Sequence, residues 1–382
     1  MNNQVSELSI LGIGTALPPY MMEQADTANR LSEALSDQPD SARWARRIFK
    51  QCGVKTRYTC EPNLLAAPSE CRYMQRSEAA DIPTTAERMS TYKKEAVPLA
   101  LAAAKEAMRD GLAEPANITH LITVSCTGQF LPGMDTVLIK QLELAPDVIR
   151  VPLNFIGCAA GLRAISLSKQ LASGHPNAKV LIVCVELCTL HIQPSGNRDA
   201  LFGASFFGDG ASACVVGPAR SEHRHFFQLG EDRSILLAKG TEEMVWEVGN
   251  FGFDLYLAPS IPKLIEECIP AEVEKLCKED EVELWAIHPG GRGIVEAIQS
   301  GYGLAPEQVA PSLDVLRDVG NVSSATILFV LDAMRKQLQE SNSDGAGGLA
   351  LAFGPGLTAE MVRIQYIPAF VRDGIIEGEV YA

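Results

Sequence analysis

The sequence predicts an α/β protein, because short apolar runs alternate with longer helical segments along the chain. The runs are continuously apolar, as in strands buried on both faces of a sheet, and the clearest cover residues 121–125, 180–185, 284–287 and 349–353. Apolar residues recur at helical spacing over residues 159–173 and 323–337, where we expect helices. A chain of 382 residues can bury a core large enough for one large domain or two α/β halves.

A weak internal repeat favours two halves. Cys126 follows a predicted strand and lies 32 positions before Cys158, which stands at a predicted helix start. In the second half, His288 follows a predicted strand and Asn321 stands at a predicted helix start, 33 positions later. Such strand ends and helix starts are where α/β folds place their chemistry. We therefore predict two pseudo-symmetric halves, residues 1–225 and residues 226–382.

Between the first apolar segment and the repeat, residues 60–91 are polar and irregular, and we expect them to form a long surface excursion. A helix is predicted to begin near Glu95 and to end at Gly111, which suits a C-cap.

Composition narrows the possible partners. The net charge of −14 argues against nucleic acid as the main partner, because phosphate backbones are bound by basic surfaces. Ten cysteines without a CxxC pair, together with scattered histidines, indicate reduced thiols and no metal site. No apolar run approaches the roughly 18–20 residues of a membrane span, and the N-terminus lacks a secretory signal. We therefore expect a cytoplasmic protein without a membrane span.

Three residues are candidates for catalysis. Cys158 stands at a predicted helix start, where the helix dipole favours a thiolate, although buried cysteine is also a common core residue. His288 precedes Pro-Gly-Gly and is either presented to a cleft or hydrogen-bonded in the core. Asn321 could be a simple helix N-cap. Together they form a nucleophilic constellation that papain-like proteases share, but the local protease signature is absent here.

Four ordered segments carry a resemblance to a known family: NFIGCAAG around Cys158, AIHPGGRGI around His288, GNVSSATILFVL around Asn321, and the later AFGPGLTAE. SCTGQFLPGMD, VELCTLHIQ and FFGDGASACVVG match in the same order. The sequence resembles the type III polyketide synthases, the chalcone synthase family, and is nearer to bacterial than to plant members. The resemblance runs from about Leu8 to Ile367.

This resemblance implies a five-layered αβαβα thiolase fold, a homodimer, and a tunnel for the pantetheine arm of coenzyme A. Cys158 would accept the starter acyl group, and His288 would keep it as a thiolate. His288 and Asn321 would stabilise the enolate that forms when malonyl-CoA loses carbon dioxide. Two donors aimed at that oxygen could contribute several kcal/mol, whereas a carboxylate in place of the asparagine would repel the charge. Acyl-CoA and malonyl-CoA are then substrates, and no further cofactor is expected.

Other positions follow from the same resemblance. Phe207 matches an aromatic gatekeeper between tunnel and cavity, and Leu131 stands where plant members reach into the partner subunit's cavity. The second gatekeeper aromatic of plant enzymes is replaced, with Leu255 or Phe253 at its place. Cys126 resembles bacterial enzymes that make small aromatic products from malonyl units. Two basic residues fall near family positions that meet the coenzyme A phosphates, and an acidic protein needs such a patch for an anionic ligand: Arg47 and Lys50.

The implied reaction is decarboxylative Claisen condensation of malonyl-CoA onto an acyl-CoA starter. We expect repeated extension of a fatty acyl starter, giving alkylpyrone or alkylresorcinol-type products. A malonyl-primed synthase of small aromatic polyketides is the alternative, prompted by Cys126. Starter, number of extensions and cyclisation depend on a cavity that distant segments form.

Three other classes compete. A β-ketoacyl-ACP synthase III-like enzyme also uses cysteine, histidine and asparagine, but HPGG and FGPG favour the polyketide synthase. A nucleotide-binding protein is disfavoured because GIGTAL lacks the last glycine of GxGxxG. A catalytically silent scaffold is disfavoured by the intact Cys158, His288 and Asn321.

Overall fold

The computed structural model describes residues 8–74, 82–173, 175–193, 195–278 and 280–369. Within them, nine strands form one mixed sheet in the order β11-β12-β13-β8-β1-β7-β6-β4-β5. Five strands come from the first part of the chain: β1 (Leu8–Ala16), β4 (His120–Ser125), β5 (Ile149–Asn154), β6 (Val180–Leu187) and β7 (Asp209–Pro218). Four come from the second: β8 (Arg224–Leu236), β11 (Leu284–Ile287), β12 (Ala346–Gly354) and β13 (Thr358–Ala369).

The strand order repeats on either side of the sheet's centre. From the centre outwards, β1-β7-β6-β4 has two antiparallel pairs and then a parallel pair, and β8-β13-β12-β11 has the same succession. The central strands β1 and β8 pair only where Ser9 and Ile10 meet Gln228 and Phe227. The domain division after residue 225, which falls inside β8, stays a prediction.

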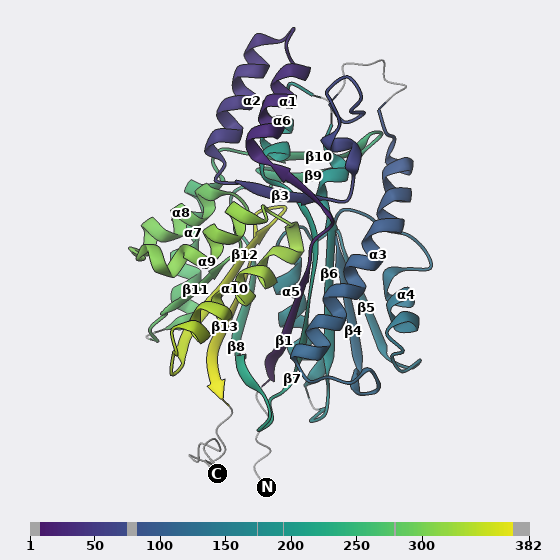
Figure 1. The fold of residues 1–382 in the computed structure, drawn as a ribbon. Coiled ribbons are helices and arrows are strands. Elements are labelled where there is room, and N and C mark those ends of the chain that lie inside the picture. The colour runs from purple at the N-terminus through teal and green to yellow at the C-terminus, as the bar shows by residue number, and fades with distance from the viewer. Residues whose placement is uncertain (1–7, 75–81, 174, 194, 279, 370–382) are drawn as a thin grey trace.

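Helices complete a layered arrangement (Figure 1). On one outer face lie α3 (Thr85–Asp110) and α4 (Met134–Gln141). Between the two parts of the sheet lie α5 (Ala160–Ala172) and α10 (Thr326–Glu340). The other outer face is covered by α7 (Ile261–Cys277), α8 (Arg292–Tyr302) and α9 (Pro306–Asp318). The expected five-layered αβαβα order is therefore present.

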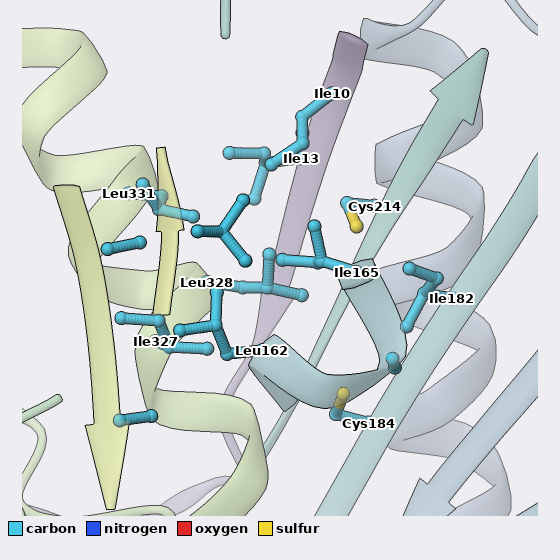
Figure 2. Packing of buried hydrophobic residues seen from close by; sticks show 14 of the residues in the cluster. Ile10, Ile13, Leu162, Ile165, Ile182, Cys184, Cys214, Ile327, Leu328 and Leu331 are labelled. Atoms are coloured by element: carbon cyan, nitrogen blue, oxygen red, sulfur yellow. The ribbon is translucent and has the colours of Figure 1, made fainter. Parts of the chain in front are cut away.

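Side-chain alternation along the strands explains the layers. In β6, Ile182 and Cys184 join a central cluster with Ile165 of α5 and Leu328 of α10 (Figure 2). The alternate residues Leu181, Val183 and Val185 pack instead among the alanines of α3. Strands buried on both faces lose the apolar–polar alternation of half-exposed strands, which is why the sequence shows continuous apolar runs.

The start of α3 corrects one prediction. The helix begins at Thr85, ten residues before the expected Glu95, because Thr84 and Glu87 form a capping box. The Oγ1 of Thr84 accepts from the backbone N–H of Glu87 at 3.3 Å, and the Glu87 carboxylate accepts from the backbone N–H of Thr84 at 2.8 Å. Part of the expected excursion over residues 60–91 is therefore helical, and residues 75–81 lie outside the described residues.

The GIGTAL segment has a packing role. A Cβ atom on Gly14 would lie 2.3 Å from the carbonyl oxygen of Ala103, so β1 approaches α3 more closely than any other residue allows. The glycines of this segment thus allow a strand and a helix to pack closely. This packing explains their presence without a nucleotide-binding role.

Smaller elements cover one end of the layers, at the top of Figure 1. They are β2 (Tyr20–Glu23), α1 (Gln24–Ala34), α2 (Pro39–Gln51), β3 (Thr56–Thr59), α6 (Arg198–Phe206), β9 (Met244–Gly249) and β10 (Gly252–Leu257). β9 and β10 form a hairpin over the ends of the central strands. Among the described residues, no helix has the length and apolar character to cross a bilayer.

Candidate active site

Two helix starts meet at the centre of the molecule. Cys158 lies just before α5, and Asn321 lies just before the 3₁₀ turn η5 (Ser323–Ala325) that leads into α10. A Cβ atom on Gly161 would lie 2.2 Å from the carbonyl oxygen of Ser324, so only glycine permits this approach. As a result, the Nδ2 atom of Asn321 lies 4.0 Å from Sγ of Cys158.

The side-chain amide of Asn321 is held from both ends. Its Oδ1 accepts from the backbone N–H of Ser323 at 2.8 Å, and its Nδ2 donates to the carbonyl oxygen of Gly290 at 3.3 Å. Its backbone N–H donates to the carbonyl of Phe206 at 2.8 Å, and its carbonyl accepts from Gly208 at 3.0 Å. Asn321 therefore caps the following turn, which is the N-cap role that the sequence also allowed. Its amide nitrogen nevertheless lies beside the thiol of Cys158.

Ser323 is a second polar neighbour of Cys158 that is not among the residues predicted from the sequence. The Cys158 thiol donates to the Ser323 hydroxyl oxygen, with Sγ and Oγ 3.7 Å apart. Ser323 stands two positions after Asn321 in the GNVSSAT motif, so its place in the motif is the signal that could have indicated it.

A buried carboxyl group braces this region. Glu186 in β6 accepts from the backbone N–H of Cys126 at 3.0 Å, from the Thr127 hydroxyl at 2.7 Å, and from the Ser324 hydroxyl. Burial raises the pKa of Glu186. Its bonds tie the end of β4 to η5, and they fix the two segments that carry Cys126 and Asn321 relative to each other.

His288 lies at the end of β11 with its backbone N–H bonded to the carbonyl of Leu351 at 2.8 Å. The residue is 0% exposed, and neither ring nitrogen has a hydrogen-bond partner among the described residues. Burial lowers its pKa to about 3, so the free imidazole is neutral. A Cβ atom on Gly290 would lie 3.6 Å from its Nε2, so the ring sits beside the loop that Asn321 contacts. No hydrogen bond joins His288 to Cys158 in the described part of the chain.

Burial also governs Cys158. It raises the pKa of the thiol to about 11, and the hydrogen bonds to Ser323 and Asn321 only partly oppose this effect. The favourable effect of the helix start on the thiolate stays a prediction, and desolvation acts against it. A base is needed to ionise this thiol at neutral pH.

The thiol opens into an inner pocket of about 110 Å³. Cys126, Phe207 and Leu255 all line it, as expected for pocket residues. Phe253 instead stacks on His191, with ring centroids 4.0 Å apart, and does not line the pocket. Sequence reasoning missed four lining residues that lie within the quoted motifs: Phe155, Ile294, Phe353 and Pro355. It also missed three that lie outside any quoted motif: Met244, Trp246 and Leu257.

An outer groove of about 800 Å³ continues from the inner pocket, since both are bordered by Met244, Leu257, Gly290 and Ile294. Arg47 lines this groove, whereas Lys50, one turn further along α2, is exposed but does not line it. Sequence reasoning missed two other groove arginines: Arg198 and Arg292.

The groove also contains an aromatic side chain from α2. The guanidinium of Arg198 lies 4.0 Å from the ring centroid of Trp44, and that of Arg47 lies 5.6 Å from it. The groove thus combines a flat aromatic surface with several cations, a suitable composition for a ligand with both a base and phosphates.

Leu131 lies away from both cavities. Its side chain is 91% exposed, and the Leu131–Pro132 peptide bond is cis. Within this chain Leu131 lines neither the inner pocket nor the outer groove. Such an exposed apolar side chain is a candidate contact with another chain.

Two family models match nearly the whole chain. The N-terminal domain of chalcone and stilbene synthases matches residues 2–220, and their C-terminal domain matches residues 234–368. The chain belongs to the chalcone and stilbene synthase family. This type III polyketide synthase is therefore an enzyme, an acyltransferase of the condensing class.

Curated relatives agree. The chain is 31% identical to the "Alpha-pyrone synthesis polyketide synthase-like Pks18" of Mycobacterium tuberculosis, over 94% of this chain and 91% of that protein. It is 32% identical to "Type III polyketide synthase 21" of Oryza sativa, over 94% and 93% of the two chains. It is 30% identical to the "Probable polyketide synthase 1" of Dictyostelium discoideum over 92% of this chain, but it spans only 11% of that longer protein.

Solved structures confirm the thiolase-like fold of this type III polyketide synthase. The C-terminal type III polyketide synthase domain of "Steely1" from Dictyostelium superposes with a TM-score of 0.85 at 29% identity, covering 94% of this chain and 99% of that one. PKS-I of the brown alga Ectocarpus siliculosus superposes with a TM-score of 0.85 at 27% identity, over 96% and 100%.

The burial of His288 predicts a pH dependence of stability. The unfolded chain binds a proton at this histidine below about pH 6.5, whereas the folded chain, with a pKa of about 3, does not. Stability from this residue is therefore lost as the pH falls from 6.5 towards 3. Between pH 7 and pH 5, wild type should lose about 2 kcal/mol more unfolding free energy than His288→Gln in urea titrations. Equal losses in the two proteins would contradict this burial.

Proposed function

We propose that this enzyme condenses malonyl-CoA with an acyl-CoA starter through a thioester on Cys158. The observation that carries the proposal is the 4.0 Å approach of the Asn321 amide nitrogen to the Cys158 sulfur, inside a pocket joined to a basic groove. A nucleophile and a hydrogen-bond donor at one pocket are what acyl transfer followed by enolate formation requires.

In the loading step, His288 accepts the thiol proton of Cys158. The resulting thiolate attacks the starter's thioester carbonyl, and the coenzyme A thiolate leaves and takes up a proton. Burial disfavours each ion taken alone, since it raises the pKa of Cys158 and lowers that of His288. When the thiolate and the imidazolium form together, their opposite charges stabilise each other. The proton transfer therefore depends on the pair and not on the pKa of either residue alone.

In the extension step, the amide nitrogen of Asn321 and a ring N–H of His288 donate to the thioester oxygen of malonyl-CoA. Carbon dioxide leaves, and the enolate carbon attacks the acyl group on Cys158. The new carbon–carbon bond releases the cysteine thiolate and leaves a β-ketoacyl-CoA product. The orphaned ring nitrogens of His288 support this role, because a buried polar group without a partner is available to a bound ligand.

The outer groove is the proposed place for coenzyme A. Its phosphates would meet Arg47 and Arg198, with Arg292, which is ion-paired to Glu296, at the same groove. These arginines give a local cationic surface on a chain of net charge −14. The pantetheine arm would then pass Met244 and Gly290, which border both cavities. A carrier-protein donor, as in the β-ketoacyl-ACP synthase alternative, has less support, because the family match extends over both domains of chalcone and stilbene synthases.

The proposed reaction repeats and ends in cyclisation to pyrone or resorcinol-type products. The name of the mycobacterial relative, which refers to alpha-pyrone synthesis, supports a pyrone. The fatty acyl starter and the malonyl-primed alternative differ in the space that they need beside Cys158.

We also propose that the enzyme works as a homodimer. Leu131 is 91% exposed, and Ile149 is 53% exposed on β5, the edge strand of the sheet. An edge strand with apolar side chains is a surface that a second copy can cover. In the dimer, Leu131 would reach the partner's cavity, as the family resemblance implies.

Cys158→Ala should abolish starter loading, because the Cys158 thiol is the nucleophile of the proposed reaction. The measurement is the intact mass of the protein after incubation with acetyl-CoA, followed by mass spectrometry of products with malonyl-CoA. Cys268→Ala is the matched control, since Cys158 and Cys268 are the two partly exposed cysteines. An acyl adduct or wild-type product yield in Cys158→Ala would exclude the proposed nucleophile.

The groove predicts a difference between two cations of α2. Arg47→Ala should raise the KM for malonyl-CoA about tenfold, which corresponds to the loss of one charged contact with a phosphate. Lys50→Ala should leave the KM near the wild-type value, because Lys50 does not line the groove. Steady-state kinetics of both variants test the position of coenzyme A, and the opposite ranking would place its phosphates elsewhere.

A further inference from the structure

The inner pocket is small for an enzyme of acyl chains. Its volume is about 110 Å³. Ligand pockets for drug-sized molecules usually measure about 300–1,000 Å³. A palmitoyl chain bound to Cys158 would far exceed this space.

One aromatic side chain lines the pocket beside the gatekeeper Phe207. Trp246 lies on β9, directly across from Leu255 on β10, and both line the cavity. Its ring meets that of Phe207 at an interplanar angle of 80°, with centroids 6.0 Å apart. Its indole nitrogen is buried and has no partner among the described residues, so a hydrogen bond does not explain the presence of tryptophan here.

The indole is fixed by its surroundings. It meets His191 edge-on at 6.1 Å and Phe253 edge-on at 6.1 Å, and these two rings are stacked on each other. The Nε2 of His191 lies 2.7 Å from the carbonyl oxygen of Thr127, and its Nδ1 accepts from the backbone N–H of Phe253 at 3.1 Å. The hairpin is therefore anchored to the segment after β4, and Trp246 is held against rings that cannot easily yield to a longer ligand.

We propose that Trp246 is the specificity-determining residue that restricts this enzyme to short acyl starters, of about butyryl length or less. The inference rests on the proposed condensation at Cys158 and names its substrate class. It favours the malonyl-primed alternative and other short starters over the fatty acyl starter that the sequence predicts. The side chain acts by its volume, because it occupies the space into which a longer acyl chain would extend.

The test measures kcat/KM with malonyl-CoA for starters from acetyl-CoA to palmitoyl-CoA. In wild type, octanoyl-CoA should be at least about tenfold poorer than butyryl-CoA, and Trp246→Leu should reduce that difference at least about tenfold. Trp246→Phe should shift the chain-length preference in the same direction by a smaller amount. This variant provides the test if Trp246→Leu folds poorly. Val248→Ala is the control, since Val248 is 64% exposed on the same strand and should leave the profile unchanged.

Two results would overturn the inference. One is a wild type that uses octanoyl-CoA or palmitoyl-CoA as well as butyryl-CoA. The other is a chain-length profile in both Trp246 variants that matches that of Val248→Ala. Failure of the proposed function itself is distinct, because it would appear as no acetyl adduct on Cys158 and no condensation with any starter.

Discussion

The close approach of the starts of α5 and α10 is the constraint on which the site depends. Cys158 and Asn321 are 163 positions apart in the chain, yet their reactive atoms are 4.0 Å apart because Gly161 lets the two helix starts touch. The approach becomes possible only when both helices are enclosed between the two parts of the sheet, where their apolar faces share one core (Figure 2). The fold and the site therefore have the same physical origin.

Burial sets the chemistry at this junction. It raises the pKa of Cys158 and lowers that of His288, so the resting pair is neutral. In the proposed reaction, two uncharged donors can stabilise the developing enolate, because hydrogen bonds in such a dry site are stronger than in water. The cationic groups Arg47 and Arg198 lie in the outer groove, which is the proposed place for the phosphates of coenzyme A.

The sequence predicts those parts of the structure whose pattern lies within a single continuous segment. The buried strands are continuous apolar runs. Glycine or proline residues mark the strand ends and helix starts at which we find Cys158, His288 and Asn321. The start of α3 was missed although Thr84 and Glu87 form a recognisable capping box. Trp246 and Arg198 could not be predicted, because they become site residues only when a hairpin and α6 fold over the strand ends. Desolvation of the thiol likewise depends on packing that no motif encodes.

The most direct test of this account is the rate of malonyl-CoA decarboxylation and condensation by Gly161→Ala. An added methyl group would lie 2.2 Å from the carbonyl oxygen of Ser324 and must separate the two helix starts. We predict a folded protein with about 100-fold lower turnover, because a displacement of about 1 Å between catalytic groups has an effect of this size. Gly301→Ala in α8, where the nearest atom is 4.0 Å away, should keep wild-type turnover. Wild-type turnover in Gly161→Ala would contradict the claim that this contact builds the active site.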